Sequence, residues 1–304
     1  MPLFIKTKKS SVPKGFIAVC IIPTLVLSVS FMIIPAFNAL RMSFTNAISM
    51  VPSDNVRFIG LENYIYMFLR DQRFHQALWN TFRLMVVVPV LNVFIGLFFA
   101  FLLTQSNLKE RGFYRVLFFF PSVISLTVVA VVWACLFDPR SGGVINRIAA
   151  LFGAGPVPWL GEENLALWCI ALVMVWQAFG YYMVMHIAAI DGISTDVYEA
   201  ASIDGAKPFH KFFLITIPLL KDTIGITWVL SLSGTINLSY ILSNVMTNAG
   251  PGNATLVLLQ HIYRMAFGVG ANFGYAMSIT VFSLVLAFVL SSLSRKISYS
   301  NENI

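Results

Sequence analysis

Six apolar stretches dominate the sequence, and each is long enough to cross a lipid bilayer. They cover residues 16–40, 77–103, 113–137, 165–190, 223–245 and 271–293. A bilayer core takes roughly 20 helical residues at a rise of about 1.5 Å each. The 304 residues are 58% hydrophobic and 11% charged. This is more apolar side chain than the core of one soluble domain could bury. We therefore expect an all-α membrane protein with six spans in one domain.

The short N-terminal tail, residues 1–15, is basic. It contains Lys6, Lys8, Lys9 and Lys14 and leads directly into the first apolar stretch. A signal peptide begins in the same way, but this apolar stretch is too long and no small-residue cleavage site follows it. We interpret the first stretch as a retained membrane anchor, and residues 294–304 as the second tail.

The distribution of basic residues predicts the orientation in the membrane. Of the 20 lysines and arginines, twelve lie on the side that holds both tails, including all nine lysines, and eight lie on the other side. The positive-inside rule makes the lysine-rich side cytoplasmic, with both termini there. The net charge of +7 therefore requires no nucleic acid partner.

The cysteines and histidines show no pattern of a disulfide framework or a metal site. The cysteines are three, one in each of three apolar stretches, and we interpret them as small apolar fillers: Cys20, Cys135 and Cys169. The four histidines lack metal-ligand spacing, and we interpret them as structural: His75, His186, His210 and His261. We expect this chain to bind no metal and no cofactor.

The apolar stretches contain no group that could couple transport to an ion gradient. No Asp, Glu or Lys lies near the middle of any stretch, whereas ion-coupled carriers keep ionisable residues there despite the cost. The sequence also lacks GxxxxGK[ST], the loop that cradles nucleotide phosphates. The chain is therefore not expected to be an enzyme, and energy for uphill transport would have to come from a partner that docks on the cytoplasmic side.

The one long cytoplasmic connection, residues 191–222, has the pattern of two short helices joined at a glycine. Asp196 is the expected N-cap of the first helix, and Glu199 three residues later completes a capping box. Asp204 and Gly205 are expected to end that helix.

The second short helix is expected to begin at Pro208, a residue favoured in the first helical turn. Phe209, Phe212 and Phe213 follow at helical spacing and form an apolar face that needs burial. Two interpretations fit this face equally well: a helix pair lying on the membrane or on its own bundle, or a docking surface for another subunit.

Two segments of this connection carry a family resemblance. Residues 199–205 read EAASIDG and residues 215–219 read ITIPL. They resemble the EAA motif of the membrane subunits of binding-protein-dependent ABC importers, in which a glycine follows EAA by four residues and I-x-L-P comes later. The surrounding string is similar to the carbohydrate branch, particularly to the larger membrane subunit of the maltose importer.

The resemblance extends over most of the chain, with a few departures. Further matching segments are IGLENY at 59–64, Asn80 with Thr81, RVLFFFP at 115–121, Trp159 with Leu160, and TNAGPGNAT at 247–255. Ile217 stands in place of the motif leucine, Ser194 in place of a frequent proline, and Ala249 in place of a frequent glycine. The extra spans and large external insertion of the maltose subunit are missing, so the resemblance does not imply maltose specificity.

The resemblance implies a six-span type I importer fold whose 191–222 loop is a coupling helix seated in a cytoplasmic ATPase subunit. Small side chains would allow close approach, the glycine would allow the turn, and Glu199 would anchor the helix. The implied ATPase-coupling residues are Glu199, Ala200, Ala201, Asp204, Gly205, Pro208, Phe209 and Pro218.

The same resemblance implies the partners and the location. The expected partners are a second homologous permease, two ATPase subunits that bind ATP and magnesium, an extracytoplasmic solute-binding protein, and a carbohydrate substrate. The expected location is the bacterial cytoplasmic (inner) membrane, which the chain crosses several times.

A polar stripe follows one face of the fifth apolar stretch. Ser233, Asn237, Tyr240 and Asn244 are spaced by four, three and four residues, and the fourth stretch adds Trp176, Gln177 and Tyr181. Uncharged hydrogen-bonding groups and aromatic rings suit a neutral sugar, so these seven residues are the predicted substrate path. Hydrogen bonding between helices, worth about 0.6 kcal/mol each, explains each residue nearly as well.

The sequence therefore predicts a permease subunit that forms half of the path of an ATP-driven sugar importer. Glycerol phosphate or another solute is the alternative within that class. A stand-alone channel or secondary carrier would need no ATPase, and a receptor or scaffold would show no transport defect on deletion. The polar stripe and the hinged cytoplasmic loop disfavour the last interpretation.

Overall fold

The computed structural model describes residues 14–49, 56–105, 108–139 and 143–299. Nearly all of the predicted N-terminal tail, with Lys6, Lys8 and Lys9, lies outside the described residues, as do residues 300–304 of the C-terminal tail. Within the described part, every regular element is a helix, and one isolated bridge pairs Thr45 with Phe58.

Five spans and one bent helix pair account for the six apolar stretches. The spans are α1 Lys14–Ser28 continued by the π-helical turn η1 Val29–Ile33 and by α2 Ile34–Met42, then α4 Gln72–Gln105, α8 Glu163–Ile190, α12 Lys221–Met246 and α14 Phe273–Tyr299. The bent pair is α5 Arg111–Val123 and α6 Leu126–Leu136. The predicted all-α, six-span architecture is confirmed, although α14 continues past the predicted end at residue 293.

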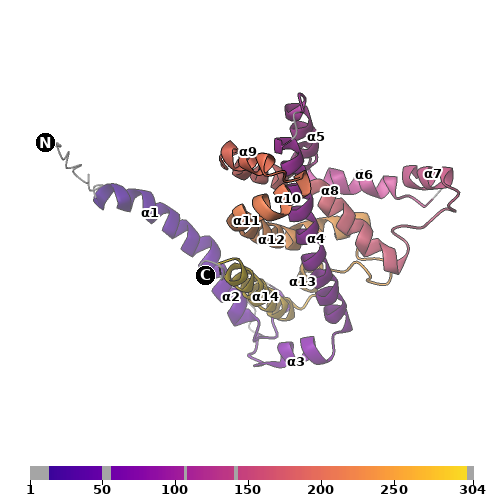
Figure 1. Cartoon of the computed structure of the whole chain (residues 1–304). Helices are drawn as coiled ribbons and strands as arrows, with labels where there is room; N and C mark the ends of the chain where they lie inside the picture. The colour runs from indigo at the N-terminus through magenta and orange to yellow at the C-terminus, as the bar shows by residue number, and fades with distance from the viewer. Residues whose placement is uncertain (1–13, 50–55, 106–107, 140–142, 300–304) are drawn as a thin grey trace.

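Short helices lie between the spans at both ends of the bundle (Figure 1). After the first, third and fifth crossings come α3 Glu62–Leu69, α7 Val144–Leu151 and α13 Leu258–Phe267, which a six-span chain places on one side. At the other end are α9 Thr195–Ile203, α10 Pro208–His210, the π-helical η2 Lys211–Thr216 and α11 Ile217–Leu219. The 191–222 loop therefore lies at the end of the bundle opposite α3.

The third apolar stretch turns through 96° between α5 and α6. Ile124 and Ser125 are extended there, with ψ of 140° and 128°. Just before the turn, Pro121 supplies no backbone N–H, and the Ser122 hydroxyl donates to the Phe119 carbonyl at 2.6 Å. Both features weaken the helical ladder, whereas Pro23 and Pro89 remain inside continuous helices.

Helices α4 and α8 form the centre of the bundle. A Cβ atom at Gly96 of α4 would lie 3.0 Å from the Met183 backbone nitrogen and 3.1 Å from the Phe179 carbonyl oxygen of α8. Only glycine allows this approach without displacing α8. The side chains of Leu84, Met174 and Leu242, from α4, α8 and α12, are fully buried where the three helices meet.

The first span stands apart from this bundle. Figure 1 shows α1 projecting away from the other helices, while α2 packs beside α14. None of the most apolar 18-residue window of the span between Ile21 and Met42 is buried. The α1 part of the span therefore presents apolar side chains on all sides and has little contact with the other spans of its own chain.

Candidate functional site

The first short helix of the 191–222 loop begins earlier than predicted. The N-cap of α9 is Ser194, whose hydroxyl accepts the Asp196 backbone N–H at 3.3 Å. The predicted cap at Asp196 and its capping box with Glu199 are therefore wrong. Asp196 lies in the first turn, where its negative charge still interacts favourably with the helix dipole.

The end of α9 lies where the sequence predicts it. Gly205 has φ +77°, a left-handed conformation that costs other residues energy. Its N–H donates to Ser202 O at 3.1 Å, and the Ala206 N–H donates to Ala201 O at 2.9 Å. This pair of bonds is a Schellman motif with Asp204 as the C-cap.

The second short helix begins at Pro208, as predicted, but its three phenylalanines do not share one environment. Phe212 is buried against three rings of α4, those of Phe94, Phe98 and Phe101. Phe209 is 68% exposed and Phe213 is 38% exposed. The rings still form one apolar face, as predicted, because Phe213 contacts both Phe209 and Phe212, at 4.5 and 4.9 Å between centroids. Only the Phe212 side of this face is buried.

A buried hydrogen bond joins the two halves of the loop. Tyr198 of α9 and Thr216 of η2 are both buried, and their hydroxyl oxygens lie 2.9 Å apart. Burial raises the pKa of the Tyr198 phenol. On the surface above them, the Lys211 ammonium donates to the Ser202 hydroxyl at 2.5 Å. α9 is therefore attached to η2, the segment whose Phe212 side chain packs against the rings of α4.

The eight predicted coupling residues lie together on the surface of this fixed loop. Seven are exposed and Ala201 is partly buried. Apolar side chains are exposed among them, with Ile203 at 87%, Leu214 at 69% and Leu219 at 55%. Nearby, Arg111 at the start of α5 forms an ion pair with Asp191 at 2.9 Å. This end of the bundle thus presents an ordered surface that is partly apolar.

The predicted substrate-path residues lie on outward faces of α8 and α12. Ser233, Asn237 and Asn244 are exposed, as are Trp176 and Tyr181, whereas Tyr240 and Gln177 are partly buried. Asn244 accepts from the Gln260 amide at 3.3 Å. For the other six residues, no side-chain hydrogen bond occurs within the described part of the chain. No hydrogen bond or ring contact joins the α8 set to the α12 set in that part.

Most hydrogen bonds from α12 to other segments are made by the face of α12 that lies opposite the polar stripe. Five small hydroxyl residues spaced by four are buried there: Thr227, Ser231, Thr235, Ser239 and Ser243. The Asn92 amide of α4 donates to the Ser231 hydroxyl at 3.1 Å, and the Ser243 hydroxyl donates to Thr255 O at 2.6 Å. This face was not predicted, although small polar residues at every fourth position are its signal in the sequence.

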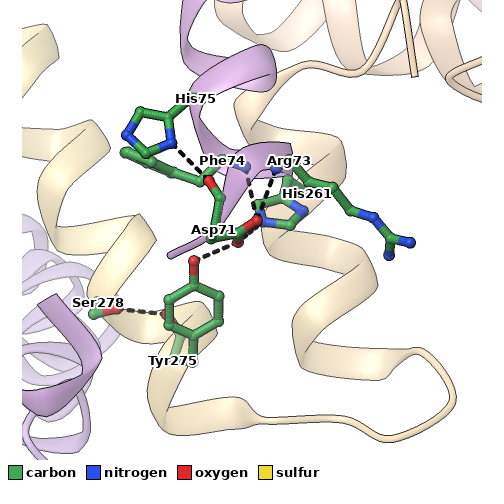
Figure 2. A network of polar contacts seen from close by, with 7 residues as sticks. All are labelled: Asp71, Arg73, Phe74, His75, His261, Tyr275 and Ser278. Carbon is green, nitrogen blue, oxygen red and sulfur yellow. Dashed lines mark hydrogen bonds and ion pairs between the residues drawn. The ribbon is translucent and has the colours of Figure 1, made fainter. Parts of the chain in front are cut away.

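At the α3 end of the bundle, a buried polar cluster joins three segments (Figure 2). Asp71 lies just before α4, and its Oδ1 accepts the backbone N–H groups of Arg73 and Phe74 at 2.9 and 3.1 Å. Its Oδ2 accepts the Tyr275 hydroxyl of α14 at 2.5 Å and contacts His261 Nε2 of α13 at 2.8 Å. One carboxylate thus caps α4 and holds α13 and α14.

The charges in this cluster follow from its burial. Burial raises the pKa of Asp71, but hydrogen bonds from Tyr275, His261 and the Phe74 backbone outweigh it and hold that pKa below its usual value. Burial lowers the pKa of His261 more than Asp71 raises it. The imidazole is therefore neutral near pH 7, and its Nε2–H donates a hydrogen bond to the Asp71 carboxylate.

The sequence analysis missed the Asp71 cluster because its members are far apart in the chain. His261 and Tyr275 lie 190 and 204 residues beyond Asp71. The structural interpretation of His261 agrees with its role here. The cysteines differ from one another: Cys169 is buried as predicted, Cys135 is exposed on α6, and the side chain of Cys20 lies outside the described ones.

Comparison with known proteins identifies the family. Residues 70–299 match the model of the binding-protein-dependent transport system inner membrane component. The probable ABC transporter permease protein YurN of Bacillus subtilis is 34% identical over 91% of this chain and 93% of its own length. The lactose transport system permease protein LacF of Rhizobium radiobacter is 31% identical, over 89% of this chain and 90% of its own.

One relative is named for a phosphorylated solute. The sn-glycerol-3-phosphate transport system permease protein UgpA of Escherichia coli O157:H7 is 30% identical over 88% of this chain and 89% of its own length. Among solved structures, a chain of a bacterial ABC transporter that imports the acidic polysaccharide alginate has a TM-score of 0.82 at 21% identity, covering 95% of this chain and 97% of that one. A second solved structure, a bacterial alginate ABC transporter in complex with an alginate pentasaccharide-bound periplasmic protein, has a TM-score of 0.82 at 20% identity, covering 95% of this chain and 96% of that one.

Proposed function

The chain belongs to the family of binding-protein-dependent transport system inner membrane components, and from that premise we propose that it forms half of the translocation path of an ATP-driven carbohydrate importer. Relatives named for lactose, trehalose and maltose, and arabinooligosaccharides support a sugar as the substrate. The relative named for glycerol phosphate keeps a phosphorylated solute as the second candidate.

The observation that carries this function is the ordered surface of the 191–222 loop. The eight coupling residues all reach the surface of a segment held by Tyr198 and Thr216. Exposed Ile203, Phe209 and Leu214 would be costly to leave in water. A cleft in a cytoplasmic ATPase subunit would bury them, and ATP would be hydrolysed there rather than in this chain.

The orientation follows from the same surface. If the 191–222 loop meets a cytoplasmic ATPase, both termini face the cytoplasm and α3, α7 and α13 face outward. This agrees with the positions of the lysines at the loop end of the bundle, at Lys109, Lys207, Lys211 and Lys221. The outward end would then receive sugar from a solute-binding protein.

Two outward faces support a second permease as a partner. The span of α1, η1 and α2 is apolar and unburied, and the stripe of Ser233, Asn237 and Asn244 is polar and exposed. Polar groups in a span are costly against lipid and need protein or water beside them. A second permease would cover the apolar first span and the polar stripe. A water-filled path would then run between the two subunits along the stripe.

The direct test is sugar-dependent ATP turnover in vesicles that contain this chain with its partner permease and ATPase subunits. With the binding protein and its sugar present, ATP hydrolysis and sugar uptake should rise together. Glu199→Lys should abolish both while the protein remains in the membrane. Unchanged stimulation in Glu199→Lys, or uptake by this chain alone down a gradient, contradicts the proposal.

A further inference from the structure

An open pocket of about 500 Å³ lies at the outward end of the bundle, directly over the Asp71 cluster. Its lining includes Arg70 and Arg73, which flank Asp71 in sequence, and His261, Met265 and Tyr275. The pocket therefore lies where the start of α4 meets α13 and the start of α14. Its volume lies within the range of protein ligand pockets, about 300–1,000 Å³, so several side chains of another protein would fit in it.

At the floor of this pocket, the Asp71 carboxylate has all of its hydrogen-bond acceptor positions occupied. The Asp71 carboxylate accepts four hydrogen bonds, two from backbone N–H groups and one each from Tyr275 and His261. Two carboxylate oxygens offer about four acceptor positions in total. Asp71 therefore has no acceptor position left for the arginines beside it, and within the described residues it forms no ion pair with Arg70 or Arg73.

The rim of the pocket is cationic and unpaired. Arg70 and Arg73 are exposed, and neither guanidinium has a hydrogen bond or an ion pair within the ranges that the structure describes. Figure 2 shows the Arg73 guanidinium directed away from the Asp71 carboxylate. One guanidinium binds a carboxylate through two parallel N–H···O bonds, and each of these two arginines has its guanidinium free to do so.

The pocket is separated from the polar stripe by the thickness of α13. His261 and Met265 face the pocket, whereas Tyr263 contacts the Tyr240 ring of the stripe at 5.9 Å between centroids. Residues two apart on a helix point in nearly opposite directions. A solute moving along the stripe would not enter this pocket, which favours a protein occupant over the transported solute.

We propose that this pocket receives an Asp or Glu side chain from the surface of the extracytoplasmic solute-binding protein, held by Arg70 and Arg73. The proposal rests on the importer function, and it names one docking contact on this chain. Because the occupied floor also joins α4, α13 and α14, docking would act on three segments of the permease at once.

The test compares the affinity of the purified solute-binding protein for the complete importer in lipid nanodiscs. The double variant Arg70→Ala with Arg73→Ala should raise the Kd at least about tenfold and flatten its dependence on salt. The matched control is Arg57→Ala, which removes an outward-facing arginine outside the pocket and should leave the Kd within about twofold. An unchanged Kd in the double variant, or an equal loss in the control, overturns the proposal.

Charge exchange identifies the partner group. Arg70→Glu with Arg73→Glu should abolish docking, and reversal of one acidic surface residue of the binding protein to arginine should restore it. No restoration by any acidic position overturns the proposal. The thermal unfolding midpoint of each variant shows that the fold is intact. If the binding protein fails to stimulate even the unmodified importer, the proposed function fails; if it stimulates the unmodified importer and the double variant alike, this inference alone fails.

Discussion

Tyr198 and Thr216 place their hydroxyl oxygens 2.9 Å apart in the buried joint between α9 and η2. Tyr198 belongs to the exposed helix that carries the EAA sequence, and Thr216 belongs to the turn that inserts Phe212 among the rings of α4. A displacement of α9 is therefore transmitted to α4 through this hydrogen bond and the aromatic cluster around Phe212, in addition to the direct chain connection to α8 through residues 191–194.

Tyr198→Phe should loosen that joint without creating a cavity. The Thr216 hydroxyl keeps its bond to Lys211 O at 3.1 Å, so the expected loss of stability is only about 1 kcal/mol. Sugar transported per ATP hydrolysed should fall. Thermal unfolding and paired uptake and ATPase assays measure the two effects.

The matched control is Tyr114→Phe, because the hydroxyl of Tyr114 makes no hydrogen bond to any described residue. It should change neither property. Equal behaviour of the two variants would show that the Tyr198 hydroxyl does not contribute to coupling.

Gly205 should tolerate alanine poorly and proline not at all. Alanine at φ +77° costs about 1 kcal/mol, although no atom lies within 4 Å of the added Cβ. Proline cannot adopt that φ, and it also removes the N–H that donates to Ser202 O. Uptake should be lost in Gly205→Pro, with membrane levels of the protein unchanged on blotting.

Gly112→Ala is the control for Gly205, since it also adds a Cβ into open space but without a left-handed φ. Its uptake should be normal. Normal uptake in Gly205→Pro would show that the turn after α9 is not needed for coupling.

Asn237→Leu combined with Tyr240→Leu should lower uptake by removing an amide and a phenol from the proposed path. Neither side chain has a hydrogen bond within the described residues, but Tyr240 loses its ring contact with Tyr263, so the free energy of unfolding should fall by about 1 kcal/mol. Initial rates of sugar uptake, normalised to membrane protein, measure the effect. Val86→Leu, on the exposed face of α4, is the control. A double variant with uptake equal to that control would remove the stripe from the path.

The Asp71 cluster should make the protein less stable in mild acid. The pKa of His261 lies below its ordinary value of 6.5, so below about pH 6.5 the unfolded chain binds more protons than the folded one. The His261 contribution is present in full above that pH and declines as the pH falls through the folded pKa. Asp71, whose pKa is also lowered, loses its contribution only at still lower pH.

His261→Gln keeps a donor for Asp71 but does not titrate. The unfolding midpoint of the unmodified protein should therefore fall more steeply between pH 7.5 and pH 5 than that of His261→Gln. Parallel pH profiles would show that folding does not shift the pKa of His261, and a shallower fall in the unmodified protein would show that folding raises it.

The sequence predicted those features that depend on local pattern. Span length and hydrophobicity placed the six membrane segments, and Gly205 and Pro208 marked the boundary between the short helices because their backbone preferences are strong. Ser194 and Asp196 are both good caps, and the turn that ends α8 decides between them. The π-helical η2 could not be predicted, since the sequence rules assume 3.6 residues per turn and π-turns are rare.

The contacts that organise the candidate sites depend instead on tertiary packing. Asp71 meets His261 and Tyr275 only because α4, α13 and α14 converge. The two faces of α12 show the same limit. Both carry polar residues, and the packing of α4 decides that Ser231 is buried and Asn237 is exposed.

Site-directed crosslinking shows whether the 191–222 loop meets an ATPase subunit. In a cysteine-free background, Ile203→Cys places a thiol on the α9 surface at a position that is 87% exposed, and Gly112→Cys provides an off-loop control at the same end. In intact membranes, the account predicts a crosslink from residue 203 to the ATPase subunit whose yield changes with bound nucleotide, and none from residue 112. Absence of a residue 203 crosslink under every nucleotide condition would contradict it.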